Sequence, residues 1–305
     1  MQRVLAIINP CSGAQQGAQI AQWLTEISVS AGLELTIRHT NIDESASNLV
    51  SDARDFARIV VAGGDGTVTE VLNGIVGAHV PLAIIPGGTG NVLGQAIGIS
   101  TDVRQACQDA LLTSETLPLD MGFLNDTTYF ALRLSIGYEA LVTRHTTRES
   151  KSRFGKLAYI WEGIRQGLRL QSARYRIDVD GVTVRQRAES IWVANTSALG
   201  VFGLELDPAI NLRDGQLDLV IFRVSRLRDI QRLFQALNRR ERLPSMLITR
   251  IPVKNYVNIV ASARQPVQVD GDTIGHTPCR IRVVPEAVSI CKPAKAQSPA
   301  LFSIR

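Results

Sequence analysis

The chain has 305 residues, 45% of them hydrophobic and 20% charged, a composition that excludes a disordered tail and a fibrous protein. At about 100–200 residues per domain, this length predicts two domains. The formal net charge of +5 combines two unlike halves, because residues 1–143 carry net −8 and residues 144–305 carry net +13. A basic half of this size favours an anionic partner, such as a membrane surface or a nucleic acid.

No segment has the features of a targeting or membrane-spanning sequence. Arg3 is followed by only five apolar residues before Asn9, too few for a signal peptide. No apolar run approaches the ~18 residues of a spanning helix. The four cysteines are scattered without a CxxC pair, which argues against a disulfide framework and a zinc site. We therefore expect a reducing, cytoplasmic compartment, with any membrane contact at the inner membrane surface.

In the first third of the chain, short apolar runs alternate with helical patterns. Runs rich in Val, Ile and Leu, typical of strands buried on both faces of a parallel sheet, occur at residues 4–8, 33–37, 59–62 and 82–85. Crossover helices are predicted at residues 14–31, 43–55 and 68–76. This order predicts a doubly wound α/β domain, whose ligands bind at the carboxyl ends of the strands.

After about residue 118 the pattern changes to antiparallel β structure. Alternation over residues 175–184 around Asp180-Gly181 predicts a hairpin. Further strands are predicted at residues 129–135, 190–195, 217–222, 257–261, 267–269 and 280–284, and helices at 156–170 and 227–237. The fold class is therefore α/β plus β. We predict an α/β domain over residues 1–118, an antiparallel β-sandwich over 119–290, and a tail or return segment over 291–305.

The strongest local signal is a glycine loop, Gly-Gly-Asp-Gly-Thr, at residues 63–67 between a predicted strand and a predicted helix. Glycines let the backbone approach a phosphate, and a helix N-terminus offers unpaired N–H groups to an anion. Thr67 and Glu70 have the spacing of a capping box for that helix. Asp65 would repel the phosphate unless a divalent cation stood between them, which implies Mg²⁺. A plain strand-to-helix turn is the alternative for an isolated loop.

Two more polar turns follow neighbouring predicted strands. Residues 86–91 form a second glycine loop, Pro-Gly-Gly-Thr-Gly-Asn, and residues 9–13 read Asn-Pro-Cys-Ser-Gly, so that Asn9 or Ser12 can reach the same crevice. Three such turns after neighbouring strands favour one shared phosphate-binding site over three unrelated turns. The P-loop signature is absent, and the glycine spacing does not match GxGxxG. Because no lysine precedes residue 151, phosphate charge is left to backbone amides, a metal and arginine.

The three motifs, the second of which extends over residues 63–74 as GGDGTVTEVLNG, resemble the diacylglycerol kinase catalytic family. That family includes bacterial lipid kinases and the sphingosine and ceramide kinases. The motifs occur in the family's order and spacing, and the resemblance extends through the C-terminal half. It implies an ATP-binding α/β domain and a β-sandwich that helps to receive a lipid alcohol, either diacylglycerol or a sphingoid-like lipid. It also implies Mg²⁺-dependent phosphoryl transfer.

Carried over to this chain, the resemblance implies roles for a set of polar residues. Around ATP it places Asn9, Ser12, Thr40, Gly63, Gly64, Asp65, Gly66, Thr67, Glu70, Gly88, Thr89 and Asn91. Asp65 and Asp120 match carboxylates of the family's magnesium network, and Val92 stands where a third is usual. Residues 211–218 are similar to a segment that holds a structural Mg²⁺ in bacterial members. Its ligands here would be Asp214 with carbonyls of Asn211 and Gln216, and an Asp-Gly turn without metal is the alternative.

The resemblance also implies the catalytic residues. Val269-Asp270-Gly271-Asp272 matches a family Asp-Gly-Glu sequence whose glutamate takes the proton from the attacking hydroxyl. Asp272, one methylene shorter, is therefore the candidate base, and Asp65 is the second catalytic candidate. Proton removal typically contributes about 10²–10⁴-fold to the rate. A hairpin turn whose carboxylates face water is the alternative.

Two other functions fit parts of the sequence. A NAD kinase also has a GGDGT loop, but that family has an acidic Asn-Glu loop where this chain has residues 86–91. A non-catalytic nucleotide or lipid sensor would keep the loops without turnover, and Val92 and Asp272 favour it. A nucleic-acid partner fits poorly, because the basic half has no recognisable reading module.

Two segments account for the charge of the basic half. Residues 144–176 hold nine Lys and Arg against two Glu, and residues 223–250 hold eight Arg against one Asp and one Glu. Each basic residue near an anionic leaflet contributes about 1 kcal/mol of binding, and the helix around Trp161 has interfacial character. We therefore expect peripheral contact with an anionic membrane, with a helix packed on the sandwich as the alternative. A homodimer is also compatible with the sequence.

Overall fold

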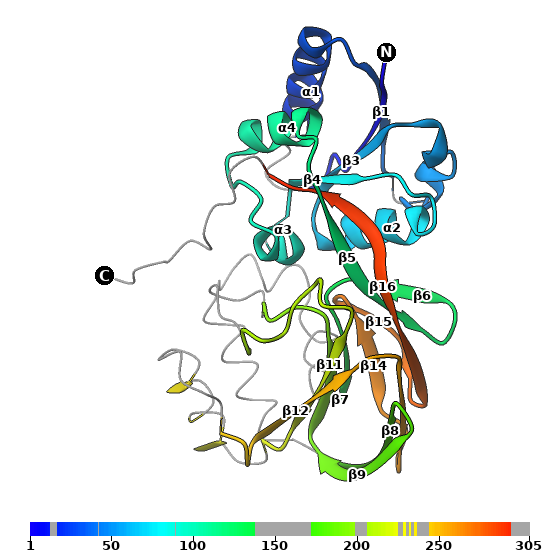
Figure 1. Ribbon diagram of the computed structural model, residues 1–305, viewed down its shortest axis with the longest axis vertical. Helices are drawn as coiled ribbons and strands as arrows, with labels where there is room; N and C mark the ends of the chain where they lie inside the picture. The colour runs from blue at the N-terminus through cyan, green and yellow to red at the C-terminus, as the bar shows by residue number, and fades with distance from the viewer. Residues whose placement is uncertain are drawn as a thin grey trace.

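The computed structural model describes residues 1–12, 17–41, 43–88, 90–137, 172–198, 206–224 and 244–293, together with Arg228, Asp229, Arg232, Gln235 and Ala236. In this part of the chain, ten strands form a mixed sheet, called sheet A, and six form an antiparallel sheet, called sheet B. An α/β part lies at one end of the molecule and a β-sandwich at the other (Figure 1). The predicted fold class is therefore confirmed.

The α/β part is a parallel sheet with helices on both faces. Its strands lie in the order β2 (Glu34–His39), β1 (Arg3–Ile8), β3 (Arg58–Gly63) and β4 (Leu82–Pro86). Leu5 and Ile7 of β1 belong to the apolar cluster under α2 (Asp65–Ile75). Ala6 and Ile8 belong to the cluster under α1 (Gly17–Ala31) and α4 (Val103–Leu112). Apolar side chains on both faces are what a doubly covered parallel strand requires.

The sandwich packs sheet B against the antiparallel end of sheet A. Sheet B has the order β12 (Ile248–Val253), β11 (Leu217–Phe222), β10 (Ser190–Ala194), β7 (Arg133–Gly137), β14 (Pro266–Val269) and β15 (Asp272–His276). The facing strands are β5 (Thr116–Leu124), β6 (Thr128–Phe130), β8 (Ala173–Val179), β9 (Val182–Ala188), β13 (Tyr256–Ala261) and β16 (Cys279–Cys291). Alternate residues of both layers, such as Ile136 and Ile177, fill one core between them.

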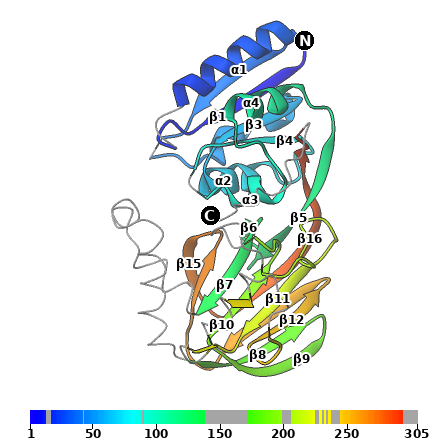
Figure 2. The same cartoon turned by 90° about the vertical axis from the view of Figure 1, so that its left-hand side faces the viewer.

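Strand β16 joins the two parts. Its first half pairs antiparallel with β13, and β5 pairs antiparallel with it on both sides of a register shift. Ile290 near its end pairs parallel with Leu82 of β4. A register shift between Val284 and Val288 lets the strand bend on the way. Both views show β16 reaching from the sandwich to the parallel strands (Figures 1 and 2). The boundary predicted between residues 118 and 119 falls inside β5, and its position stays a prediction.

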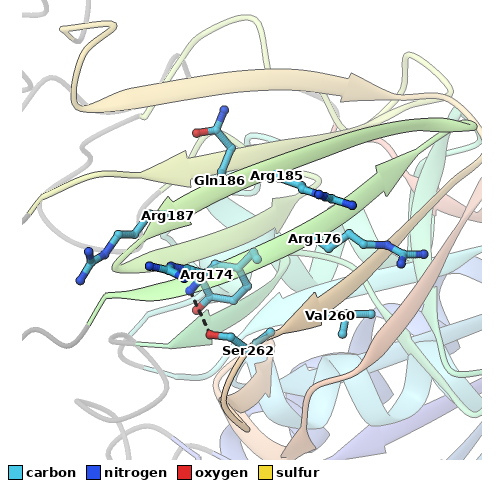
Figure 3. Close-up of a pocket in the computed structure, with 9 residues that line it drawn as sticks. Arg174, Arg176, Arg185, Gln186, Arg187, Val260 and Ser262 are labelled. Carbon is cyan, nitrogen blue, oxygen red and sulfur yellow. Dashed lines mark hydrogen bonds between the residues drawn. The ribbon is translucent and has the colours of Figure 1, made fainter.

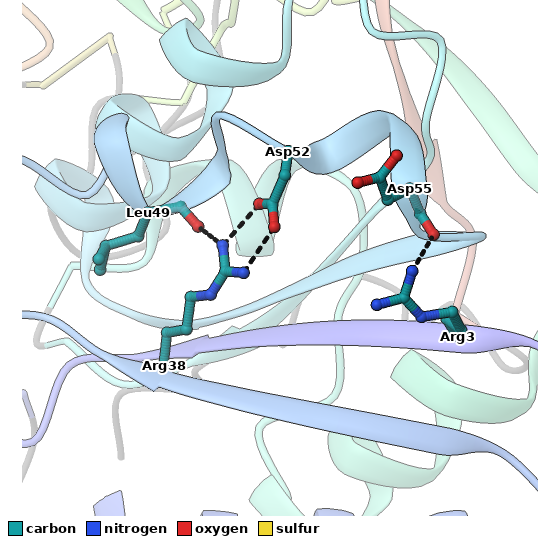
Figure 4. A network of polar contacts seen from close by, with 5 residues as sticks. All are labelled: Arg3, Arg38, Leu49, Asp52 and Asp55. Carbon is teal, nitrogen blue, oxygen red and sulfur yellow. Dashed lines mark hydrogen bonds and ion pairs between the residues drawn. The ribbon is translucent and has the colours of Figure 1, made fainter.

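The helix predicted over residues 43–55 is wrong. Two 3₁₀ turns, η1 (Asn48–Val50) and η2 (Ala53–Asp55), occupy this segment. Arg38 donates to the Leu49 carbonyl at 2.6 Å and forms two bonds of 2.6 Å with the Asp52 carboxylate (Figure 4). In an α-helix that carbonyl would accept the amide four residues later, whereas here it accepts from the arginine.

Other predicted elements are confirmed with changes at their ends. The β8–β9 hairpin turns at Asp180 and Gly181, which have φ of 49° and 88°. The single strand predicted over residues 129–135 is two strands, β6 and β7. Five elements were not predicted: α3 (Val92–Ala96), α4, β5, β12 and β15. The helix predicted at 156–170 lies outside the described residues, as does most of the one at 227–237.

No helix in the described ranges is long and apolar enough to cross a membrane.

Candidate active site

Three loops meet at the carboxyl edge of the parallel sheet, after β1, β3 and β4. The Asn9 side-chain amide donates to Thr67 Oγ1 at 2.9 Å, which joins the first loop to the second. The Gly87 N–H donates to the Gly63 carbonyl at 2.9 Å, which joins the third loop to the second. The structure therefore brings the three predicted loops into one cluster.

The two glycine loops pack backbone against backbone. A Cβ on Gly88 would lie 2.7 Å from Gly64 Cα, and a Cβ on Gly63 would lie 2.8 Å from Thr67 Cβ. Neither distance is tolerable without movement of the backbone or of a branched side chain. Glycine is therefore required at these positions, and it keeps side chains out of the space between the loops.

The remaining candidate nucleotide residues lie around these loops. Asn91, with φ of 48°, closes the second glycine loop by accepting the Gly88 N–H at 2.8 Å and donating to the Gly88 carbonyl at 2.6 Å. Ser12 Oγ donates to the Asn9 carbonyl at 2.8 Å. Thr40 follows β2 at the same edge, where its N–H donates to the Ile8 carbonyl at 3.0 Å. Gly66 is exposed in the first turn of α2, and Thr89 lies outside the described residues.

The predicted capping box is wrong. Helix α2 begins at Asp65 with Gly64 as its N-cap, and no side chain caps it. Thr67 therefore lies inside the first turn, where it accepts the bond from Asn9. Glu70 instead accepts from Ser45 Oγ at 2.9 Å and from the Ala46 N–H at 2.6 Å, so it fixes the preceding crossover against α2. Its role toward a nucleotide stays a prediction.

Asp65 is partly buried between α2 and the short helix α3. Its Oδ1 accepts the Leu93 N–H at a long 3.4 Å. Burial raises the pKa of Asp65, while backbone N–H groups of α3 and the charge of Arg133 act in the opposite direction. A desolvated carboxylate with such weak hydrogen bonding is stabilised by a nearby cation.

The donor set fits one kind of magnesium site. Mg²⁺ is commonly held by one or two carboxylates together with substrate phosphates and waters, and Asp65 beside the glycine loops can supply such a carboxylate. Within the described ranges, no group of three His, Cys, Asp or Glu side chains could enclose a metal. The residues present therefore fit an ion shared with a nucleotide.

Asp120 is buried in β5 with both carboxylate oxygens engaged. Its Oδ2 accepts the Gly215 N–H at 2.7 Å, and its Oδ1 accepts the Glu286 N–H at 2.8 Å. Asp120 thus joins the 211–216 loop to the bulge of β16. The two predicted metal sets, one containing Asp120 and one containing Asp214, therefore lie beside each other. The assignment of Asp120 to a magnesium network stays a prediction.

In the 211–216 loop, side chains bond to nearby backbone. Asn211 Oδ1 accepts the Arg213 N–H at 3.2 Å, and Asp214 Oδ1 accepts the Gln216 N–H at 3.2 Å. Turns of this kind form without a metal. The Mg²⁺ site predicted at Asn211, Asp214 and Gln216 stays a prediction.

Asp270, which the sequence analysis did not assign a role, connects the sandwich to α2. Its buried carboxylate accepts the N–H groups of Ala131, Leu132 and Arg133 at 2.9–3.0 Å and the Thr69 hydroxyl at 3.2 Å. The first three bonds occupy the break between β6 and β7, which explains why that predicted strand is divided. Asp270-Gly271 is recognisable as a turn dipeptide, but only the tertiary structure shows that its carboxylate faces inward.

Asp272, the candidate base, lies two residues beyond this link. It is exposed at the start of β15 and pairs in register with Val269. Thr69, the partner of Asp270, is four residues after Asp65 on α2, so both lie on one face of that helix. The β14–β15 hairpin therefore approaches the face of α2 that carries Asp65, as the position of β15 below α2 in Figure 2 illustrates.

Arg133 was also missed by the sequence analysis. Its guanidinium lies 4.7 Å from the centre of the Trp192 ring and donates to the Ala198 carbonyl at 3.1 Å. Its charge opposes the rise in the pKa of Asp65 that burial causes. Arg133 is thus a candidate cation for a site whose own domain has no lysine.

Comparison with known proteins covers nearly the whole chain. A family model described as "Diacylglycerol kinase catalytic domain" matches residues 3–124, and one described as "YegS C-terminal NAD kinase beta sandwich-like domain" matches residues 133–292. A diacylglycerol kinase of Bacillus subtilis (strain 168) is 29% identical over 91% of this chain and 92% of its own length. One from Staphylococcus carnosus (strain TM300) is 26% identical over 98% of both chains. A crystal structure of a diacylglycerol kinase from Bacillus anthracis str. Sterne has a TM-score of 0.75 at 22% identity, covering 97% of this chain and 98% of that one. This likeness establishes the fold.

Proposed function

Because the chain belongs to the diacylglycerol kinase catalytic family, we propose that it transfers the γ-phosphate of ATP to the hydroxyl of a lipid alcohol. The observation that carries the proposal is the packing of three glycine-bearing loops at one sheet edge beside Asp65. The relatives named diacylglycerol kinase match along nearly their whole length and make a NAD kinase the weaker alternative.

The α/β side binds the phosphates in this proposal. Phosphoryl transfer depends mainly on positioning the two substrates and on neutralising charge. Backbone N–H groups of the glycine loops and the N-terminus of α2 face the anion. Asp65 would hold Mg²⁺, which neutralises phosphate charge when bound. Arg133 adds a cation from the sandwich side.

The sandwich side presents the acceptor. Asp272 accepts the proton of the lipid hydroxyl as it attacks, because an exposed carboxylate at the start of β15 is accessible to an alcohol. Asp270 does not compete for this role, since four hydrogen bonds already engage its carboxylate. Asp270 instead fixes the hairpin turn that positions Asp272.

A substrate panel tests the proposal. The purified protein is incubated with labelled ATP and Mg²⁺ and with diacylglycerol, a sphingoid base or NAD⁺ as acceptor. We expect label in a lipid and its loss in the Asp65→Ala variant. Label in NAD⁺ would favour the NAD kinase alternative. ATP binding without transfer to any acceptor would favour the non-catalytic sensor.

A further inference from the structure

Four arginines gather on the outer face of the β8–β9 hairpin, away from the candidate active site. Arg174 and Arg176 of β8 and Arg185 and Arg187 of β9 are all exposed, and we call them the arginine face. In β8, the residues that alternate with Arg174 and Arg176 point into the sandwich core. The four arginines therefore lie on the opposite face of sheet A. Figure 3 shows them together with Val260 and Ser262.

The register places these charges directly opposite one another. Arg174 pairs with Arg187, and Arg176 pairs with Arg185. Like charges in directly opposed positions destabilise a sheet. Within the described ranges, no carboxylate forms an ion pair with any of the four. Some other arginines do have such partners, in the pairs Arg3–Glu34, Arg38–Asp52 and Arg282–Asp126, whereas the exposed Arg54 and Arg104 are likewise without an ion pair in the described ranges but do not stand opposite another arginine. Arg187 does interact within the fold, because its Nε donates to Ser172 Oγ at 2.5 Å and its charge opposes the rise in the pKa of Glu189 that burial causes. A bound anion would offset the remaining repulsion between the opposed arginines.

The arginine face surrounds a shallow cavity of about 460 Å³ between the hairpin and β13. Val260 contributes an exposed apolar side chain to its wall, with 48% of its surface accessible. The Arg174 N–H donates to Ser262 Oγ at 3.3 Å, which links the hairpin to the end of β13. Cations around an apolar side chain suit a phosphate-bearing head group with hydrocarbon beneath it.

Protection of a sheet edge does not account for the whole cluster. Strand β9 is an edge strand of sheet A, and charged side chains commonly prevent such edges from pairing with another chain. This explains Arg185 and Arg187. It does not explain Arg174 and Arg176, because β8 lies between β9 and β13 and has no free edge.

We propose that the arginine face docks the protein on an anionic phospholipid leaflet. The choice of a lipid partner rests on the proposed function, in which a membrane alcohol becomes an anionic phosphate. A nucleic acid fits less well, because Tyr175, the aromatic residue of the cavity wall, is only 3% exposed and offers no surface for base stacking.

The position of the arginine face makes it a tether separate from the chemistry. Strands β8 and β9 lie at the end of the molecule opposite the α/β part in both views (Figures 1 and 2). Docking there leaves the glycine loops open to nucleotide. Because the product of the proposed reaction is more negatively charged than its substrate, product formation strengthens the attachment.

Vesicle sedimentation of the full chain tests the proposal. The vesicles are phosphatidylcholine with or without phosphatidic acid. At about 1 kcal/mol per basic residue, each arginine is worth about fivefold in partition, so Arg176→Gln/Arg185→Gln should bind about 25-fold more weakly. Arg174→Gln/Arg187→Gln is a second, independent pair. The control, Arg54→Gln/Arg104→Gln, removes two exposed charges from the α/β part and should bind like the wild type.

Equal partition of the hairpin variants and the control would overturn the proposal. So would binding of the wild type to a DNA duplex but not to vesicles of equal phosphate concentration. Thermal unfolding checks that the variants are folded, and removal of opposed charges should leave Arg176→Gln/Arg185→Gln at least as stable as the wild type.

Activity on detergent-dispersed diacylglycerol separates the two proposals. Normal activity with lost vesicle binding in the hairpin variants supports a tether. The wild type could instead bind vesicles through these arginines and yet phosphorylate no lipid. That result supports docking and contradicts the proposed function.

Discussion

The two sides of the candidate active site are held together in different ways. On the α/β side, the loops interlock through their backbones, with the Gly87 N–H on the Gly63 carbonyl and Gly64 against Gly88. On the sandwich side, the β14–β15 hairpin depends on the Asp270 carboxylate, which has one bond to α2 and three within the sandwich. The phosphate side is thus built into the fold, whereas the acceptor side is positioned by side chains. Substitutions should therefore affect folding on the first side and positioning on the second.

The largest expected effect concerns the two carboxylates assigned to chemistry. Asp272→Ala should lower kcat by about 10²–10⁴-fold with little change in the KM for ATP, because it removes the base alone. Asp65→Ala should abolish phosphorylation, since it removes the carboxylate next to the phosphates. Steady-state kinetics on the best lipid of the panel measures both. Asp43→Ala, at an exposed carboxylate elsewhere, is the control, and normal turnover by Asp272→Ala would remove the proposed base.

The next effect tests whether the glycine loops are part of the fold. Gly88→Ala should lower the free energy of unfolding by about 1–3 kcal/mol and weaken ATP binding, because its Cβ would meet Gly64 Cα at 2.7 Å. Gly66→Ala is the matched control for stability alone, since a Cβ there meets nothing within 4 Å and alanine favours the helix. Denaturant unfolding and nucleotide titration measure the two effects. An equal free energy of unfolding of the two variants would contradict backbone interlocking.

A smaller loss is expected from Asp270→Asn. The amide group can offer only one oxygen to four donors, so at least one buried N–H loses its acceptor. The free energy of unfolding should fall by about 1–3 kcal/mol. Because the hairpin carries Asp272, kcat should fall while ATP affinity measured by titration is retained. If Asp270→Asn lowered ATP affinity as well as kcat, the Asp270 hydrogen bonds would support the phosphate side and the acceptor side of the site equally.

The smallest effect isolates the bond between the two parts. Thr69→Val removes the 3.2 Å bond to Asp270 and leaves the three bonds within the sandwich. The expected cost in unfolding free energy is about 0.5–1.5 kcal/mol. Any kinetic change should appear in kcat, because this bond holds the hairpin that carries Asp272 against α2. Thr25→Val, at an exposed hydroxyl of α1, controls for loss of a surface hydrogen bond.

Local sequence patterns were sufficient to predict those elements whose structure depends on burial alone. Strands β1, β3 and β4 are apolar on both faces, and their runs of Val, Ile and Leu predict them and their parallel arrangement. The motifs after them likewise predicted loops that the structure brings together. Residues 43–55 show the limit, because their apolar spacing predicted a helix and gave no sign of the bond from Arg38 to the Leu49 carbonyl. Val50 and Ala53 are nevertheless buried.

Long-range side-chain contacts explain the other omissions. Asp270 meets Thr69 across 201 positions of sequence, and no periodicity reports such a contact. The arginine face was missed for a related reason. Counting charges along the chain identifies basic segments, but Arg185 and Arg187 fall outside both, and only strand register shows that they stand opposite Arg174 and Arg176.

The course of β16 has a consequence for synthesis of the protein. The outer edge of β4 is paired through Ile290, which leaves the ribosome long after β4 itself. A nascent chain that has produced only the parallel strands therefore carries an open sheet edge, the kind of surface that promotes aggregation. The nucleotide layer is completed only when nearly the whole chain has been made. Truncations near residue 290 should accordingly damage the N-terminal layer first, although they lie at the other end of the sequence.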